Sequence, residues 1–179
     1  TANYFLKVHD KHLCFGAEAP DTCCTEQALR SLYQTAFAWD HRPAFVLITG
    51  DLVHEGTSAD YARAKTLLQE LDEQYHTKTY PALGNHDIRK NFNSAVRGLA
   101  SDQPLDYCVQ NEWLRWIVLD SSCGQAIGQL SGSQLAWLEQ ELCEPTDCPT
   151  ILALHHPVYG TTTEETDGNN LATPDRLIR

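Results

Sequence analysis

Side chains that can bind metal ions follow four separate apolar segments of this 179-residue chain. In chain order they are Asp10 and His12, then Asp51, then Asn85, His86 and Asp87, then His155 and His156. Aspartate oxygens and imidazole nitrogens are ligands for Mn, Fe, Zn and Co. Two such cations ~4 Å apart can hold both the attacking and the leaving oxygen of a phosphoryl transfer. The pattern predicts a two-metal centre in which Asp51, at the end of a central strand, bridges the two ions.

The apolar segments themselves are short and continuous, which is typical of buried strands. Strands are predicted at residues 4–9, 43–51, 78–84 and 150–154, with a hairpin around Asn111–Glu112. Helical spacing of apolar residues predicts helices at 25–40, 58–75 and 131–142, with a further helix after Thr173–Pro174. The proposed caps are Thr25, Thr57 or Ser58, and Ser131 or Ser133.

This alternation of strands and helices predicts a single α/β domain, residues 1–179, with an at least partly parallel sheet. Sites in open α/β sheets form beyond the carboxyl ends of the strands, so residues far apart in sequence can converge there. Gly50 and Gly84 stand at two of these strand ends, where a close backbone approach or a positive φ is expected.

The composition narrows the class of protein. The chain is 42% hydrophobic and 21% charged, with a formal net charge of -11, which argues against binding duplex nucleic acid. No apolar run approaches the ~20 residues that span a bilayer, so no membrane partner is expected. A cytoplasmic enzyme with reduced thiols is expected, and oligomeric state is left open. The seven cysteines are at positions 14, 23, 24, 108, 123, 143 and 148. All four tryptophans are expected to pack in the core: Trp39, Trp113, Trp116 and Trp137.

The order of these motifs resembles that of the calcineurin-like metallophosphoesterases. The matching segments are Asp10-Lys11-His12, Gly50-Asp51, Gly84-Asn85-His86-Asp87 and His155-His156-Pro157. The stretch from Leu119 to Leu142 is similar to the class III cyclic nucleotide phosphodiesterases. The resemblance implies a four-layer α/β/β/α sandwich and hydrolysis of phosphoesters by an activated water that attacks phosphorus in line.

The resemblance also implies a role for each residue. One metal ion would be held by Asp10, His12 and Asp51, and the other by Asp51, Asn85 and His155. The metal could be Mn, Fe, Zn or Co. Asn85 and His86 would face a small phosphorylated substrate, a nucleotide in the first instance, with Asp87 orienting His86. His54, three residues after Asp51, either coordinates a metal, contacts the substrate or is a solvated loop residue.

One element of the family pattern is missing, because no histidine follows His156 and the final G-H-x-H motif is therefore absent. A domain truncated at its C-terminus is expected, with each metal one protein ligand short. The first substrate class is a cyclic nucleotide such as 3',5'-cAMP. The alternatives are a phosphomonoester, a glycerophosphodiester, a nucleotide anhydride, or a catalytically impaired domain that serves as a binding module.

Overall fold

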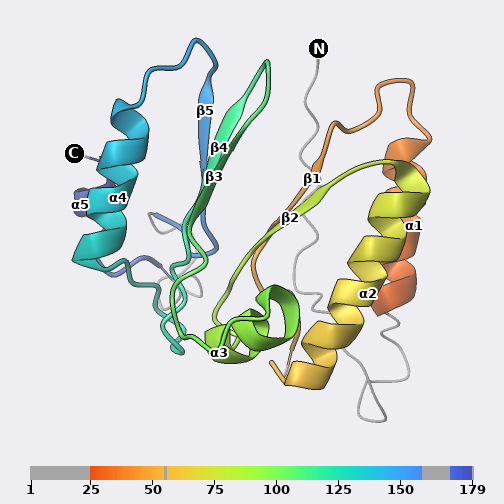
Figure 1. Ribbon diagram of the computed structural model, residues 1–179, viewed down its shortest axis with the longest axis horizontal. Coiled ribbons are helices and arrows are strands. Elements are labelled where there is room, and N and C mark those ends of the chain that lie inside the picture. The colour runs from red at the N-terminus through yellow and green to blue at the C-terminus, as the bar shows by residue number, and fades with distance from the viewer. Residues whose placement is uncertain (1–24, 55, 159–169, 179) are drawn as a thin grey trace.

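The computed structural model describes residues 25–54, 56–158 and 170–178 of the chain. The predicted strand at 4–9, and Asp10 and His12 after it, lie outside these residues. Figure 1 shows the elements, which in chain order are α1 (Thr25–Phe37), β1 (Val46–Thr49), α2 (Ser58–Tyr75), β2 (Thr79–Ala82), α3 (Arg89–Phe92), the π-helical turn η1 (Asn93–Arg97), β3 (Tyr107–Gln110), β4 (Arg115–Val118), α4 (Gly132–Cys143), β5 (Thr150–Ala153) and α5 (Asp175–Ile178).

The described strands form two sheets. β1 and β2 pair in parallel, with Val46 opposite Thr79. In the other sheet β4 lies between β3, its antiparallel neighbour, and β5, its parallel neighbour. The predicted hairpin is confirmed, since residues 111–114 connect β3 to β4. The predicted α/β class with partly parallel pairing is confirmed as well.

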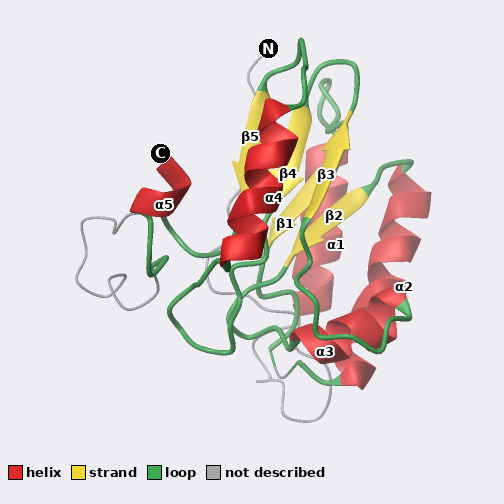
Figure 2. Cartoon of the chain, turned by 60° about the vertical axis from the view of Figure 1, so that its left-hand side comes forward, coloured by secondary structure: helices red, strands yellow, loops and turns green. Residues whose placement is uncertain are grey.

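The two sheets face each other and carry helices on their outer faces (Figures 1 and 2). Trp116 and Val118 of β4 point into the core between the sheets, where Phe45 stacks on Trp116 at a ring distance of 4.2 Å. Ile117, between them in sequence, points the other way and packs with Leu138 of α4. This alternation is the period-two pattern of a strand buried on both faces. With α1 and α2 covering the β1–β2 sheet, the order of layers is α/β/β/α.

Side-chain caps fix the starts of the two long helices near the site. Thr57 accepts a hydrogen bond from the Asp60 amide while Asp60 accepts one from the Thr57 amide, a capping box that starts α2 where the sequence predicts it. Ser131 and Gln134 form the same arrangement at α4. These reciprocal bonds satisfy amides at the first turn of each helix, which have no partner within the helix.

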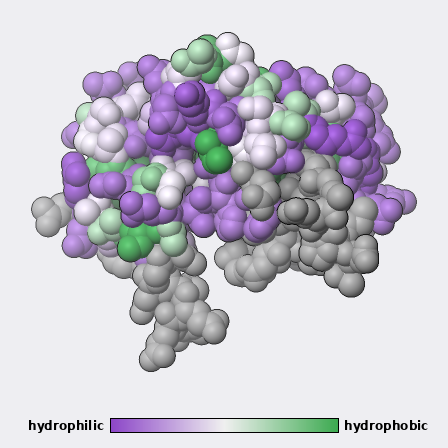
Figure 3. Space-filling view, turned by 90° about the horizontal axis from the view of Figure 1, so that it is seen from below, coloured by the Kyte–Doolittle hydropathy of each residue, from purple (hydrophilic) through white to green (hydrophobic). Residues whose placement is uncertain are grey.

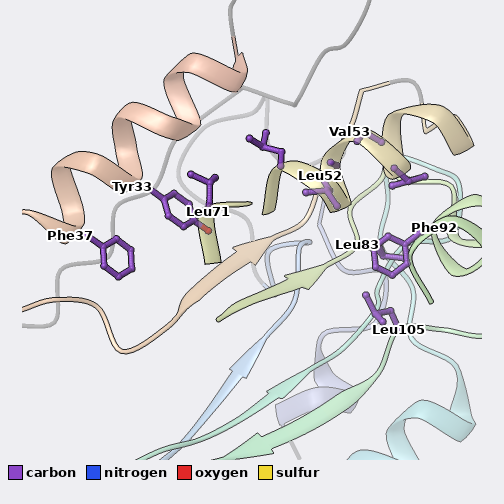
Figure 4. Close-up of a cluster of buried hydrophobic side chains, with 11 residues drawn as sticks. Tyr33, Phe37, Leu52, Val53, Leu71, Leu83, Phe92 and Leu105 are labelled. Atoms are coloured by element: carbon purple, nitrogen blue, oxygen red, sulfur yellow. The ribbon is translucent and has the colours of Figure 1, made fainter. Parts of the chain in front are cut away.

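Buried apolar side chains hold the segments that carry the site motifs (Figure 4). Leu52 and Val53 directly follow Asp51, and Leu83 directly precedes Gly84. All three belong to the core between the β1–β2 sheet and helices α1 and α2, and none exposes more than 4% of its surface. The loops at these strand ends are therefore anchored on both sides of the polar residues.

Two of the four tryptophan predictions are wrong. Trp116 is buried and Trp137 packs against the core under α4, but Trp39 is 41% exposed and Trp113 is 70% exposed. Trp113 lies in the turn between β3 and β4, and Trp39 lies two residues past the end of α1. Both residues lie outside a helix or strand, so the spacing of apolar residues along an element does not predict whether they are buried.

Two remaining expectations from the sequence are reduced cysteines and the lack of a segment that could span a membrane. The four cysteines in the described part, Cys108, Cys123, Cys143 and Cys148, are free. Among the helices within residues 25–54, 56–158 and 170–178, none has both the length and the apolar character that a bilayer crossing requires.

Candidate metal and phosphoester site

The predicted ligands lie just beyond the carboxyl ends of three strands. Asp51 is two residues past β1, Asn85 three residues past β2, and His155 two residues past β5. Because these strand ends lie at the same end of the two sheets, the three loops meet there (Figure 1). Figure 3 views the molecule from this end, and the described surface there is mostly hydrophilic.

His155 is the centre of the arrangement. Its Nε2 lies 3.0 Å from Asn85 Oδ1 and 3.5 Å from Asp51 Oδ2, while its Nδ1 lies 2.9 Å from the Thr49 carbonyl oxygen. A carbonyl can only accept, so Nδ1 carries the hydrogen and Nε2 of the neutral ring presents a lone pair. The Asp51 carboxylate directs Oδ2 toward the same nitrogen, so a divalent cation between them would accept electron pairs from both groups.

These separations fit a shared divalent cation. Ligands ~2.1 Å from one ion are roughly 3.0 Å apart at neighbouring octahedral positions and roughly 3.4 Å apart in a tetrahedron. The observed 3.0 Å lies at the octahedral value and the observed 3.5 Å lies close to the tetrahedral value. The bond from Nδ1 to Thr49 fixes the tautomer that a ligating histidine needs. Within the described ranges no three His, Cys, Asp or Glu side chains form a metal-binding group, so the amide of Asn85 is the third member of this trio.

Two glycines make the close approach possible, as their positions in the sequence predict. A Cβ on Gly84 would lie 2.2 Å from Asp51 Oδ1 and 2.5 Å from the Asp51 backbone nitrogen. A Cβ on Gly50 would lie 2.5 Å from His155 Nδ1, and Gly50 has a φ of 104°. Asp51 itself has a φ of 53°, in the left-handed region that most residues avoid.

Both oxygens of Asp51 are directed into the site region. Oδ1 accepts a hydrogen bond of 3.0 Å from the His86 amide, and Oδ2 faces His155. This carboxylate thus contacts groups from both other loops, which is the position required of a bridging ligand. Its expected contacts to an ion on Asp10 and His12 involve residues outside the described part of the chain.

Asp87 has a different environment from the one expected. It is 3% exposed, and its carboxylate accepts hydrogen bonds from the Leu52 and Gly84 amides at 3.0 and 2.9 Å and from the Tyr61 hydroxyl at 3.0 Å. A weaker contact comes from the Val53 amide at 3.4 Å. Burial raises the pKa of this carboxyl, partly offset by the two amide bonds. Asp87 therefore joins the loops after β1 and β2 through their backbones, instead of orienting the imidazole of His86.

Tyr61, on α2, completes this junction. Its hydroxyl donates to Asp87 and accepts from the Ile88 amide at 2.8 Å. Burial, followed by the nearby Asp87 charge, raises the pKa of Tyr61, so the hydroxyl stays protonated and able to donate. Sequence reasoning missed this residue because a tyrosine on the apolar face of a helix has the same pattern as any core residue.

The histidine proposed to contact substrate is stacked against another. The rings of His86 and His54 lie 5.0 Å apart at 26°. His86 is half-buried and His54 is exposed. The structure therefore places His54 beside the motif that follows β2, which the spacing from Asp51 alone could not establish.

His156 differs from its neighbour in every respect that matters for ligation. It is 1% exposed, its Nδ1 lies 2.7 Å from the Ser121 hydroxyl, and its ring packs against Gly128, where a Cβ would approach within 2.2 Å. Burial, then the neighbouring His155, lowers the pKa of His156 to about 4. His156 is a neutral core residue that fixes the loop after β5, while His155 faces Asn85 and Asp51.

Comparison with known proteins gives a consistent result. The model of the calcineurin-like phosphoesterase family matches residues 20–178. A probable cyclic nucleotide phosphodiesterase of Rhodococcus erythropolis is 36% identical over 157 residues, 87% of this chain and 52% of the relative. A cAMP/cGMP dual specificity phosphodiesterase of Mycobacterium tuberculosis is 39% identical over 160 residues, 85% of this chain and 49% of the relative. The chain thus spans about half the length of the curated relatives it matches.

A solved structure supports the fold independently of sequence. The crystal structure of a dimetal phosphatase from Danio rerio superposes with a TM-score of 0.62 at 13% identity, covering 86% of this chain and 66% of that one. The α/β/β/α arrangement of the described elements therefore matches that of a solved dimetal phosphatase. With the family match over most of its length, the chain belongs to the calcineurin-like phosphoesterase family.

Proposed function

We propose that this chain carries the active centre of a metal-dependent phosphodiesterase, with cyclic nucleotides as the first substrate class. The observation that carries the proposal is the convergence of Asp51, Asn85 and His155 from three separate loops to within 3.0 to 3.5 Å. The names of the two phosphodiesterase relatives favour the substrate class.

The contacts support roles for three of the ligands. Asp51, Asn85 and His155 would hold one divalent ion. The resemblance to the family adds a second ion, which Asp51 would share with Asp10 and His12. When bound, two such cations polarise the phosphoryl oxygens and lower the pKa of an attacking water towards neutrality. The donor set of carboxylate, amide and imidazole suits Mn, Fe, Zn or Co, and metal analysis of the purified protein identifies the ion.

The imidazole of His86 supplies a hydrogen-bond donor to a phosphate oxygen beside the ions. Its backbone amide already binds Asp51 Oδ1, so its position is tied to the central carboxylate. His54 stacks on this ring and limits its rotation, which keeps the donor aimed at the substrate. His54 is thus a positioning residue whose exposed ring also lines the approach to the site.

A second candidate substrate class is a glycerophosphodiester. A glycerophosphodiester phosphodiesterase of Enterobacter lignolyticus is 34% identical over 125 residues, 65% of this chain and 42% of the relative. Both classes are diesters, so the metal centre serves either one. Turnover of 3',5'-cAMP and of glycerophosphoethanolamine by the same preparation separates the two.

The test of the proposal is hydrolysis of bis(p-nitrophenyl) phosphate by the 179-residue chain with added Mn²⁺. Asn85→Ala removes one ligand and is expected to lower turnover by more than the ~10–100-fold that outer partners of a metal site typically cost. His41→Ala is the matched control, because His41 is an exposed histidine that precedes β1, whereas Asp51 follows the other end of this strand. Turnover that is absent with Mn²⁺, or equal in Asn85→Ala, would contradict the proposal.

A further inference from the structure

The three ligands of the described site belong to two different sheets. Asp51 and Asn85 follow strands of the β1–β2 sheet, whereas His155 follows β5 of the other sheet. The distances between their ligating atoms therefore depend on how the sheets are held at this end. The core between the sheets is apolar, and apolar contacts are not directional. Directed polar contacts fix the spacing instead, and the bond between His155 Nδ1 and the Thr49 carbonyl is one of them.

Arg89 makes such a contact. It is the first residue of α3, two residues after Asp87, and so belongs to the loop that carries Asn85. Its Nε donates to Asp120 Oδ2 at 2.7 Å, and its Nη2 donates to the Ser122 carbonyl. Asp120 is two residues past β4, on the other sheet, and is fully buried. One guanidinium thus spans the two sheets at the end where the ligands meet.

Asp120 is itself fixed from several directions. Its carboxylate accepts hydrogen bonds of 3.0 Å from the Leu105 and Ser122 amides. Its backbone amide donates to Asp106 Oδ1 at 2.9 Å, and its carbonyl accepts from Gln134 of α4 at 2.8 Å. These bonds hold Asp120 in place, so its ion pair with Arg89 fixes the position of the loop that carries Arg89.

Only two residues, Ser121 and His156, connect Asp120 to the proposed ligand His155. Ser121 is the next residue, and its hydroxyl lies 2.7 Å from His156 Nδ1. His156 is the direct neighbour of His155 and is buried in the core. The loop after β4, held by Arg89, therefore also holds the loop after β5.

We propose that Arg89 is a positioning residue that clamps the loop carrying Asn85 to the loops after β4 and β5, and so sets the affinity of the ion shared by Asp51, Asn85 and His155. This inference rests on the proposed function. An arginine suits the task because its planar fork makes two directed hydrogen bonds at once. The exposed pair of Arg63 with Glu26, between α1 and α2, offers a contrast within the same chain.

The experiment measures metal binding as well as turnover. Mn²⁺ and Co²⁺ are titrated into the metal-free chain, with calorimetry and the visible absorption of Co²⁺ as readouts. Arg89→Lys keeps a positive charge beside Asp120 but cannot contact Asp120 and the Ser122 carbonyl together. Arg89→Gln removes the charge, and Arg89 lines a cavity of about 300 Å³ in which water can take up the space that the shorter side chain leaves. Thermal unfolding checks that both variants are folded.

The expected result is a split between affinity and turnover. In both variants Kd for one of the two binding steps rises by about 10–100-fold, the range typical of outer partners of a metal site. The other step, and kcat at saturating metal, stay within about twofold of the wild type. Arg63→Gln, which removes an exposed arginine–carboxylate pair, changes neither quantity. A general loosening of the fold would instead weaken both steps together.

The outcomes separate the two proposals. If the unmodified chain binds no divalent metal, the proposed function fails and the inference fails with it. If the unmodified chain binds metal and both folded Arg89 variants bind it with unchanged Kd, the inference alone is overturned. The same holds if kcat at saturating metal falls while both Kd values stay constant.

Discussion

Gly84→Ala is the substitution for which the structure gives the sharpest expectation. The added Cβ would lie 2.2 Å from Asp51 Oδ1 and 2.5 Å from the Asp51 backbone nitrogen, about 1 Å short of ordinary contact. The φ of Gly84 is not in the left-handed region, so alanine meets no conformational penalty there and the effect is steric. Because one of the two opposing atoms is backbone, relief requires the loop after β1 to move, and Asp51 moves with it.

The size of the effect can be worked out from this displacement. Overpacking a buried position typically costs about 1–3 kcal/mol of stability. A 1 Å misplacement of an active-site group can cost about 100-fold in rate, which corresponds to about 2.7 kcal/mol of transition-state stabilisation. Urea unfolding measures the first quantity, and kcat/KM for bis(p-nitrophenyl) phosphate with Mn²⁺ measures the second. Mn²⁺ affinity should fall in parallel, since Asp51 is a proposed ligand of both ions.

Gly132→Ala is the matched control. Gly132 is the first residue of α4, and the nearest atom to an added Cβ is the Arg176 side chain at 3.9 Å. Alanine restricts the unfolded chain more than glycine does and meets no clash at this position, so this variant should be at least as stable as the wild type and fully active. If Gly84→Ala folds with wild-type Mn²⁺ affinity and turnover, the close approach of the two loops has no functional consequence and the reasoning fails.

Three further predictions use other parts of the site. Asp87→Ala leaves the Leu52 and Gly84 amides without their acceptor, and at about 1–3 kcal/mol per buried unsatisfied donor it should destabilise the chain by at least 2 kcal/mol in urea unfolding, whereas exposed Asp147→Ala should not. The pKa of His156 is lowered from 6.5 to about 4, so between these pH values the unfolded chain binds more protons than the folded chain. The free energy of unfolding of the metal-free protein should therefore fall by about 3 kcal/mol as the pH falls from 6.5 to 4. A His156→Asn variant whose stability shows the same dependence on pH would contradict this origin. Addition of Mn²⁺ at 100 times its Kd should stabilise the folded chain by about 2.7 kcal/mol, and EDTA should reverse the shift in Tm; an unchanged Tm would argue against binding to the folded state.

The elements that sequence reasoning located best are those with redundant local signals. Helix α2 begins and ends where its apolar spacing and the Thr57 cap predict, because periodicity and capping agree there. Strand β1 covers only part of the predicted 43–51 segment, since the apolar run extends beyond the paired residues into the loops. The sequence nevertheless located the carboxyl ends of the strands closely enough to predict that Asp51, Asn85 and His155 lie near one another.

The supporting contacts were beyond the reach of local patterns. Arg89 and Asp120 are separated by 31 positions, and nothing in either neighbourhood marks them as a pair. The hydrogen bonds of Asp87 go mainly to backbone amides, which every sequence has, so the motif reveals the residue but not its partners. Such contacts depend on the relative placement of whole elements, which is a property of the packed fold.

The backbone of Asp51 restricts the amino acid at this position independently of any metal. With φ at 53°, residue 51 adopts a conformation in which asparagine, aspartate and glycine are enriched, because their short side chains bond locally or are absent. Glutamate carries the same charge and ligates metals equally well, but it would have to bear the left-handed strain and would place its carboxylate one carbon further out. Asparagine would accept the conformation yet lack the charge. Aspartate is therefore the one residue that satisfies both the turn and the chemistry, and substitutions here should be far less tolerated than the simple requirement for a carboxylate would suggest.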